Sequence, residues 1–285
     1  MTQPVRTEIG RDGIARLTLD DPSSRVNTLH RAMWEALGEA CAALRDRADL
    51  RGLVLQSAKP GIFVAGADLR EIAALPIDDP QPTRDLVYRG RNVLAALESL
   101  PFPTVAFIDG AALGGGFELA LACDFRLTGP NPKVKVGLPE VKLGLIPGWG
   151  GTQRPARIIG LDPAARIVCT GESLTAEQGR QLGLIDREGD ADHVADFFAS
   201  LPKNFAECRL DKSGPVMKSA DVSPLKELLS SLTDDQRPAG EAALRVVQGG
   251  APLPLDQALA LEESEFVALV ASAGARRLIA AFLHR

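Results

Sequence analysis

Two glutamates lie in otherwise apolar stretches of the chain, and both could do acid–base chemistry. Glu118 comes directly after the glycine run 114–116 and Phe117, and Glu140 comes directly after Leu138-Pro139. A buried pair of carboxyl groups has its two pKa values pushed apart, which provides an acid and a base at neutral pH without histidine. Each residue alone has a plainer interpretation, Glu118 as a charge that stabilises a helix dipole and Glu140 as an exposed charge beside a proline turn. The presence of both favours catalysis.

The glycine run next to Glu118 could bind a developing negative charge. Gly114, Gly115 and Gly116 lie between an expected strand end and an expected helix start. The first N–H groups of a helix have no partner within it and point outward with the positive end of the helix dipole. Because glycine has no side chain, a ligand oxygen could approach this backbone closely. The run is therefore either an oxyanion hole or a turn that serves close packing alone.

Several other kinds of chemistry find no support in the sequence. The 285 residues include three histidines, four cysteines and one tyrosine, so a multi-histidine metal site would need nearly every histidine, and we expect no metal. There is no Gly-Lys pair, which excludes a P-loop, and the GxGxxG, HExxH and GxSxG motifs are absent. The sequence therefore favours acid–base chemistry by carboxyl groups over these other kinds of chemistry.

Charge and composition limit the partners and the compartment. The formal net charge is −5 and 5% of the residues are aromatic, so we expect no nucleic-acid partner. The cysteines form no CxxC pair, which favours buried thiols in a reducing compartment. No apolar run approaches the ~20 residues that a transmembrane helix needs, and the first ten residues lack an apolar signal core. We therefore expect a cytoplasmic protein without a membrane span.

Strands and helices alternate along the first two-thirds of the chain. Alternating or β-branched residues predict strands at 14–19, 52–55 and 104–108. Spacings of three and four predict helices at 29–44, 84–100 and 117–123. Such alternation with short links is typical of an α/β fold.

The composition changes after about Asp186, where strand-like runs become rare. We expect an irregular or loosely helical connector at 211–238, followed by two helices. Leu255, Leu259, Phe266 and Val270 would share one face of the first, and Leu278, Ile279 and Phe282 would pack from the second.

Three segments together resemble the crotonase (enoyl-CoA hydratase/isomerase) superfamily. Ala65-Gly66-Ala67-Asp68 resembles its AGAD loop, residues 109–120 resemble its xGxxxGGGxEL element, and residues 139–154 resemble its PExxLGxxPGxGGTQR element. Order and spacing agree over roughly residues 10–186. Val26-Asn27-Thr28-Leu29 and Lys59-Pro60-Gly61 resemble more closely the hydratase part of multifunctional fatty-acid oxidation proteins.

This resemblance implies a fold and an assembly. The fold would be a crotonase-like spiral of repeated ββα units over residues 1–186, with a helical C-terminal region over residues 187–285. That region would cover the site and contact neighbouring subunits in a homo-oligomer, a trimer or a hexamer.

The resemblance also implies roles for individual residues. Glu118 and Glu140 would be catalytic, the N–H groups of Ala67 and Gly115 would form the oxyanion hole, and Gly148 would orient a water molecule. The coenzyme A (CoA) part of the substrate would contact Val26, Ala65, Asp68 and Leu69. Arg25, Lys59 and Arg70 are candidates for its phosphates, or are solvated surface charges.

The implied activity is hydration of a 2-trans-enoyl-CoA thioester to a 3-hydroxyacyl-CoA. It would need neither metal nor redox cofactor, because coenzyme A belongs to the substrate. Two alternatives remain: a Δ3,Δ2-enoyl-CoA isomerase, and a non-catalytic acyl-CoA-binding subunit.

Overall fold

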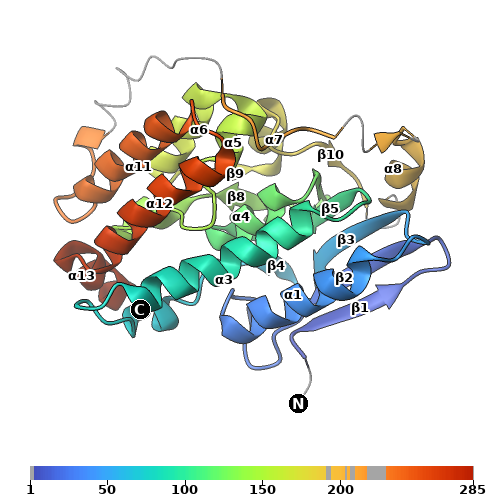
Figure 1. Ribbon diagram of the computed structural model, residues 1–285, viewed down its shortest axis with the longest axis horizontal. Helices are drawn as coiled ribbons and strands as arrows, with labels where there is room; N and C mark the ends of the chain where they lie inside the picture. Colours follow the sequence, from blue (N-terminus) through green and yellow to red (C-terminus); the bar gives the residue numbers. More distant parts are fainter. Residues whose placement is uncertain (1–2, 191–193, 203, 206–208, 217–228, 285) are drawn as a thin grey trace. The chain divides into compact units, whose positions relative to one another are not determined.

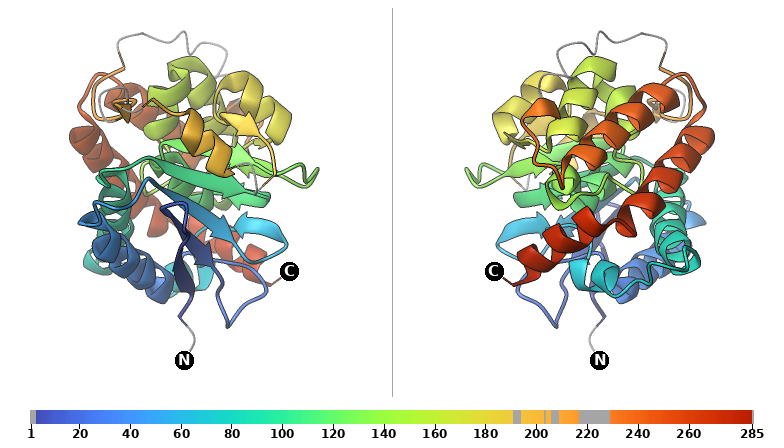
Figure 2. Two further views of the ribbon diagram at one scale, coloured as in Figure 1. Left: turned by 90° about the vertical axis from the view of Figure 1, so that its right-hand side faces the viewer. Right: turned by 90° about the vertical axis from the view of Figure 1, so that its left-hand side faces the viewer.

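The computed structural model of the chain describes residues 3–190, 194–202, 204–205, 209–216 and 229–284. These residues form two compact units that interleave along the sequence (Figures 1 and 2). Unit 1 comprises Met1–Gly66, Gly90–Val136 and Leu174–Leu210, and unit 2 comprises Ala67–Arg89, Gly137–Ser173 and Asp211–Arg285. Helix α3 (Gln81–Glu98) contributes residues to both. The expected division between residues 186 and 187 stays a prediction.

Unit 1 contains a six-stranded sheet with the order β1-β2-β3-β5-β7-β10. The strands are β1 (Val5–Ile9), β2 (Ile14–Leu19), β3 (Gly52–Ser57), β5 (Thr104–Ile108), β7 (Phe125–Thr128) and β10 (Arg187–Glu188). Strand β1 is antiparallel to β2, and the following pairs are parallel. All five residues of β5 are buried, as a strand covered on both faces requires. The strands expected at 14–19, 52–55 and 104–108 are confirmed.

A second sheet has the order β4-β6-β8-β9. Its strands are β4 (Gly61–Val64), β6 (Gly110–Leu113), β8 (Lys135–Gly137) and β9 (Ser173–Thr175). Strand β6 lies in a stretch that sequence patterns left as a glycine-rich turn. It pairs in parallel with β4, with Gly110 opposite Gly61. A Cβ atom on Gly110 would collide with the Gly61 backbone, so glycine here permits the close approach of two strands.

Helices cover the sheets of unit 1. Helix α1 (Arg31–Arg45) confirms the helix expected at 29–44, and it lies beside β1 (Figure 1). Its buried face contains Met33, Trp34, Leu37, Cys41 and Leu44 at helical spacing. The other helices of this unit are α4 (Gly115–Ala122), α7 (Ala176–Leu182) and α8 (Val194–Ser200).

Unit 2 is built almost entirely from helices. They are α2 (Leu69–Ala73), the 3-10 helix η1 (Pro139–Leu143), α5 (Arg154–Ile159), α6 (Leu161–Thr170), α11 (Arg237–Gly250), α12 (Leu255–Val270) and α13 (Ala273–Leu283). Helix α11 packs against α6 and α12, and α13 contacts α2 and η1 (Figure 2). The expected helical C-terminal region is confirmed.

The C-terminal helices show where apolar patterning succeeded and where it failed. Leu259, Phe266 and Val270 of α12 are buried as expected. Phe282 of α13 is 51% exposed, which contradicts the expected packing against the described residues. The expected connector at 211–238 lies partly outside the described residues.

No single helix in the described ranges is long and apolar enough to cross a membrane. The bent pair α12 and α13 together meets the length and composition that a span requires.

The start of α4 depends on the absence of a side chain at Gly116. A Cβ atom there would collide with the Val64 carbonyl oxygen of β4, whereas one on Gly38 of α1 would lie 3.4 Å from Val93 Cγ2. We expect Gly116→Ala to lower the free energy of unfolding by about 1–3 kcal/mol, and Gly38→Ala to leave it unchanged or raise it by up to ~1 kcal/mol. Urea unfolding of the two variants measures the difference. Equal stability would contradict the close packing of α4 on β4.

Candidate active site

The residues expected at the site divide between the two units. Unit 1 contains Val26, Ala65, Gly115 and Glu118, and unit 2 contains Ala67, Asp68, Leu69, Glu140 and Gly148. The chain passes from one unit to the other inside the first motif, after Gly66, and directly before the third motif, after Val136. The predicted residues therefore fall into two groups, one in each unit.

In unit 1, the glycine run forms the start of helix α4. Gly114 precedes the helix with a φ of +54°, and within the described chain no side chain caps this end. The N–H groups of Phe117 and Glu118 donate to the Gly114 carbonyl oxygen, at 2.8 and 3.0 Å, so helical bonding begins after the N–H groups of Gly115 and Gly116. These two N–H groups can serve as donors to an anionic oxygen.

Glu118 lies in the first turn of α4, where every residue is buried. Glu118 itself is 1% exposed. The sequence correctly predicts this placement near a helix start, although the helix begins two residues earlier than expected, on Gly115.

The predicted CoA-contacting loops of unit 1 are held together by one buried amide. Asn27 donates to the carbonyl oxygens of Leu19 and Phe63, both at 3.2 Å, and to Ser57 Oγ at 2.9 Å. The backbone carbonyl oxygen of Asn27 accepts the Ala65 N–H at 2.9 Å. Asn27 lies within the motif Val26-Asn27-Thr28-Leu29, but no local pattern in the sequence predicts a role for it. This residue fixes Val26 beside the segment that contains Ala65.

Gly66 carries this segment to the start of α4. It has a φ of +116°, and a Cβ atom on it would lie 3.2 Å from the Leu113 carbonyl oxygen and 4.0 Å from the Gly115 nitrogen. Glycine is therefore favoured here by both backbone conformation and space. Unit 1 thus places the first half of the AGAD loop beside the candidate oxyanion-hole donor Gly115.

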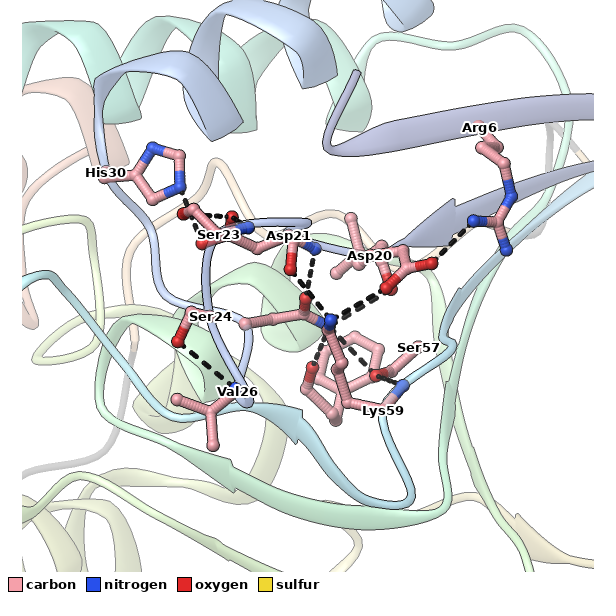
Figure 3. Close-up of polar contacts among 12 residues, drawn as sticks. Arg6, Asp20, Asp21, Ser23, Ser24, Val26, His30, Ser57 and Lys59 are labelled. Carbon is pink, nitrogen blue, oxygen red and sulfur yellow. Dashed lines mark hydrogen bonds and ion pairs between the residues drawn. The ribbon is translucent and has the colours of Figure 1, made fainter. Parts of the chain in front are cut away.

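Charged side chains hold the loop that precedes Val26 (Figure 3). Lys59 Nζ lies 2.9 Å from Asp20 Oδ1 and donates to the Asp21 carbonyl oxygen at 2.8 Å. Asp20 also pairs with Arg6 at 2.6 Å, and Asp21 Oδ2 lies 3.0 Å from His30 Nε2. The Lys59 side chain is therefore held by Asp20 and Asp21 and is only 17% exposed. The expectation that Lys59 is a solvated surface charge is wrong.

In unit 2, the AGAD loop leads into helix α2. Asp68 Oδ1 accepts the Arg70 N–H at 2.9 Å and caps the helix. The carboxylate therefore has a local structural partner, while the neighbouring Ala67 and Leu69 are half-buried and Arg70 is exposed. Contacts of Asp68 and Leu69 with CoA stay predictions.

Glu140 lies in η1, whose first residue is Pro139. The residue as a whole keeps some exposure, but its Oε2 atom is buried and has no hydrogen-bond partner in the described part of the chain. Burial, together with the nearby carboxylate of Glu262, raises the pKa of Glu140 to about 8. The group can therefore carry a proton at neutral pH and donate it.

Gly148 begins a turn that a C-terminal helix supports. Gly150 N–H donates to Glu262 Oε1 at 2.6 Å, and Thr152 donates to Glu262 Oε2 through its N–H at 3.0 Å and its hydroxyl at 2.5 Å. Glu262 was missed by sequence reasoning. Its signal was a glutamate on the apolar face of a predicted helix, three residues after Leu259 and four before Phe266.

A metal site receives no support from the described residues, among which no group of three or more histidine, cysteine, aspartate or glutamate side chains could hold an ion.

The raised pKa of Glu140 predicts how the free energy of unfolding changes with pH. Between its ordinary value of 4.5 and about 8, the folded protein keeps a proton that the unfolded chain has released. Stability from this group is therefore lost as the pH rises through that window. We expect Glu140→Gln to gain more than about 1 kcal/mol in free energy of unfolding, relative to the unaltered protein, between pH 5 and 8.

Chemical denaturation at several pH values measures this gain. The control is Glu177→Gln, which alters an exposed glutamate paired with Arg180 at 2.9 Å. If the stability difference between Glu140→Gln and the unaltered protein stays constant with pH, the raised pKa is wrong.

Comparisons with known proteins identify the family of this chain. The sequence profile of the family described as Enoyl-CoA hydratase/isomerase matches residues 10–223. The alpha subunit of the fatty acid oxidation complex from Vibrio parahaemolyticus is 35% identical over 283 residues, which cover 96% of this chain and 40% of that protein. The chain thus spans about two-fifths of the length of the curated relatives that it matches.

Solved structures share the fold. An enoyl-CoA hydratase from Bacillus halodurans has a TM-score of 0.70 at 26% identity, over 98% of this chain and 99% of that one. Human mitochondrial delta3-delta2-enoyl-CoA isomerase has a TM-score of 0.71 at 24% identity, over 99% and 98%, and this likeness concerns the fold alone. The mixed α/β architecture is that of the crotonase fold, and the chain belongs to the enoyl-CoA hydratase/isomerase family.

Proposed function

We propose that the protein is an enoyl-CoA hydratase, which adds water across the 2-trans double bond of an enoyl-CoA thioester. The observation that carries this proposal is the presence of two glutamates, the buried Glu118 and Glu140 with its buried Oε2 atom, at the two motif positions of a family described as enoyl-CoA hydratase/isomerase. Family membership supports the substrate class, and the pair of carboxyl groups supports hydration over other reactions.

Two backbone N–H groups would hold the thioester carbonyl oxygen. Gly115 N–H lies at the uncapped start of α4, and Ala67 follows Gly66, the residue that approaches Gly115. Hydrogen bonds from both groups would stabilise the enolate-like charge on the thioester oxygen after hydroxide adds to Cβ. Such preorganised donors typically lower the barrier by several kcal/mol.

The two glutamates would manage the protons. Glu118, as a carboxylate, would accept a proton from water while the hydroxide forms its bond to Cβ, and Gly148 N–H would help orient that water. Glu140 would deliver its proton to Cα as the enolate collapses. Overall, one O–H bond of water and the π bond between Cα and Cβ break, and one C–O and one C–H bond form. Proton exchange with solvent returns the two carboxyl groups to their first state. The raised pKa of Glu140 suits its role as the acid.

The isomerase alternative would use one glutamate as a proton shuttle and add no water. Structural likeness to an isomerase does not favour it, because hydratases share the same fold at similar TM-scores. The alternative of a non-catalytic acyl-CoA-binding subunit predicts loss of a glutamate, and the chain keeps both. We also infer that the protein acts as a homo-oligomer, a trimer or a hexamer, and that it needs neither metal nor redox cofactor.

Crotonyl-CoA tests the proposed function directly. Hydration removes the conjugated enoyl-thioester absorbance, and we expect the unaltered protein to bleach it. Glu118→Gln and Glu140→Gln should each lower kcat by ~10²–10⁴-fold, because each removes one acid–base group. Glu188→Gln, which alters an exposed glutamate of β10, should keep full activity.

The alternatives give different outcomes in the same assay. Conversion of a 3-enoyl-CoA without any hydration of crotonyl-CoA or longer enoyl-CoAs would establish the isomerase. Binding of acyl-CoA without turnover of any of these thioesters would establish the non-catalytic subunit.

A further inference from the structure

Glu262 of α12 is a buried acid that the proposed reaction does not use. The residue is 0% exposed, and α12 belongs to the C-terminal region, far in sequence from all three motifs. An unpaired buried carboxylate is costly, so a glutamate at a core position of a helix calls for a physical explanation.

The explanation lies in the three hydrogen bonds that Glu262 accepts. Oε1 receives the Gly150 N–H at 2.6 Å, and Oε2 receives the Thr152 N–H and hydroxyl at 3.0 and 2.5 Å. Both oxygens of the carboxylate are therefore satisfied by one short turn. Hydrogen bonds from backbone N–H groups to a carboxylate are among the stronger ones in proteins, so this contact fixes the turn firmly.

The same face of α12 supports the turn sterically. Leu259, Glu262 and Phe266 follow one another at spacings of three and four and therefore share a helix face. A Cβ atom on Gly148 would lie 3.1 Å from the Phe266 ring, and one on Gly150 would lie 3.2 Å from Leu259 Cδ2. The turn therefore lies so close to α12 that a side chain at either glycine would press on this helix face, and Glu262 holds the turn there.

Glu262 is also an electrostatic neighbour of Glu140 within unit 2. Its negative charge is one of the causes that raise the pKa of Glu140. Burial raises the pKa of Glu262 itself, while the hydrogen bonds from the turn and the guanidinium of Arg154 act in the opposite sense. One side chain thus acts on both unit 2 groups that the hydratase proposal uses, the Gly148 turn and Glu140.

We propose that Glu262 is a positioning residue for hydration, which holds the Gly148–Thr152 turn so that Gly148 N–H orients the attacking water. This inference rests on the proposed function, since it assigns a task to the turn of that same site. It gives the C-terminal helix α12 a role in the chemistry as well as in covering the core.

Replacing Glu262 by glutamine tests this proposal with minimal change of shape. Glutamine turns one accepting oxygen into an N–H donor, which would face a donor of the turn. We expect kcat for crotonyl-CoA to fall by about 10- to 100-fold, because small displacements of positioning groups have effects of this size. KM should change less than about threefold, because the turn holds water rather than CoA.

Two further variants separate positioning from loss of folding. Glu265→Gln makes the same change on the same helix, in a residue paired with Arg245 at 3.1 Å, and should leave kcat and KM unchanged. Thr152→Val removes one of the three donors and should give a smaller fall in kcat. In hydrogen–deuterium exchange, the segment 148–152 should exchange at least about tenfold faster in Glu262→Gln, and should be unaffected in Glu265→Gln.

Each outcome decides the proposal. Unchanged kcat in Glu262→Gln would overturn it, and so would a fall in kcat with unchanged exchange of the turn, since Glu262 would then act in another way. If the unaltered protein hydrates no enoyl-CoA, the proposed function is wrong and the catalytic part of this inference falls with it. The exchange experiment would still show, independently of activity, whether Glu262 holds the turn.

Discussion

The energetic penalty for burying a carboxylate is the constraint around which this protein is organised. An ionised carboxyl group in an apolar environment must either receive hydrogen bonds or take up a proton. Glu262 meets the first condition, because three donors of one turn satisfy both of its oxygens. Glu140 meets the second, because its buried Oε2 lacks a partner in the described part of the chain and its pKa rises to about 8. Glu262 therefore fixes the turn that it contacts, and Glu140 can donate a proton.

Backbone N–H groups make a second contribution to the candidate site. Gly114, Gly115 and Gly116 start α4 without a cap, and the collision that a Cβ at Gly116 would cause shows how tightly that start packs on β4. The same glycines that allow this packing leave two N–H groups for an anionic oxygen. Residues implicated in the reaction lie in both units, and family membership is what joins them into one proposed mechanism.

The features that the sequence predicted are those with a local signal. Helix α1 and strand β2 follow from apolar periodicity, and the start of α4 follows from its glycines. Strand β6 was missed because its partner β4 lies about 50 residues earlier in the chain, so no local pattern distinguishes Gly110 from a turn residue. Glu262 was missed for the same kind of reason, since its hydrogen-bond donors are 110 and 112 residues away. Phe282 has the spacing of a core residue but no described element to cover it.

In the proposed reaction, two glutamates and two backbone N–H groups add the elements of water to an enoyl thioester with defined geometry. The reaction of crotonyl-CoA with the unaltered protein in D₂O, followed by NMR of the product, tests this proposal. We expect 3-hydroxybutyryl-CoA with a single deuterium at Cα, in one of the two diastereotopic positions, syn to the new hydroxyl group. Deuterium in both Cα positions, exchange at Cγ without hydration, or recovery of unlabelled crotonyl-CoA would contradict it.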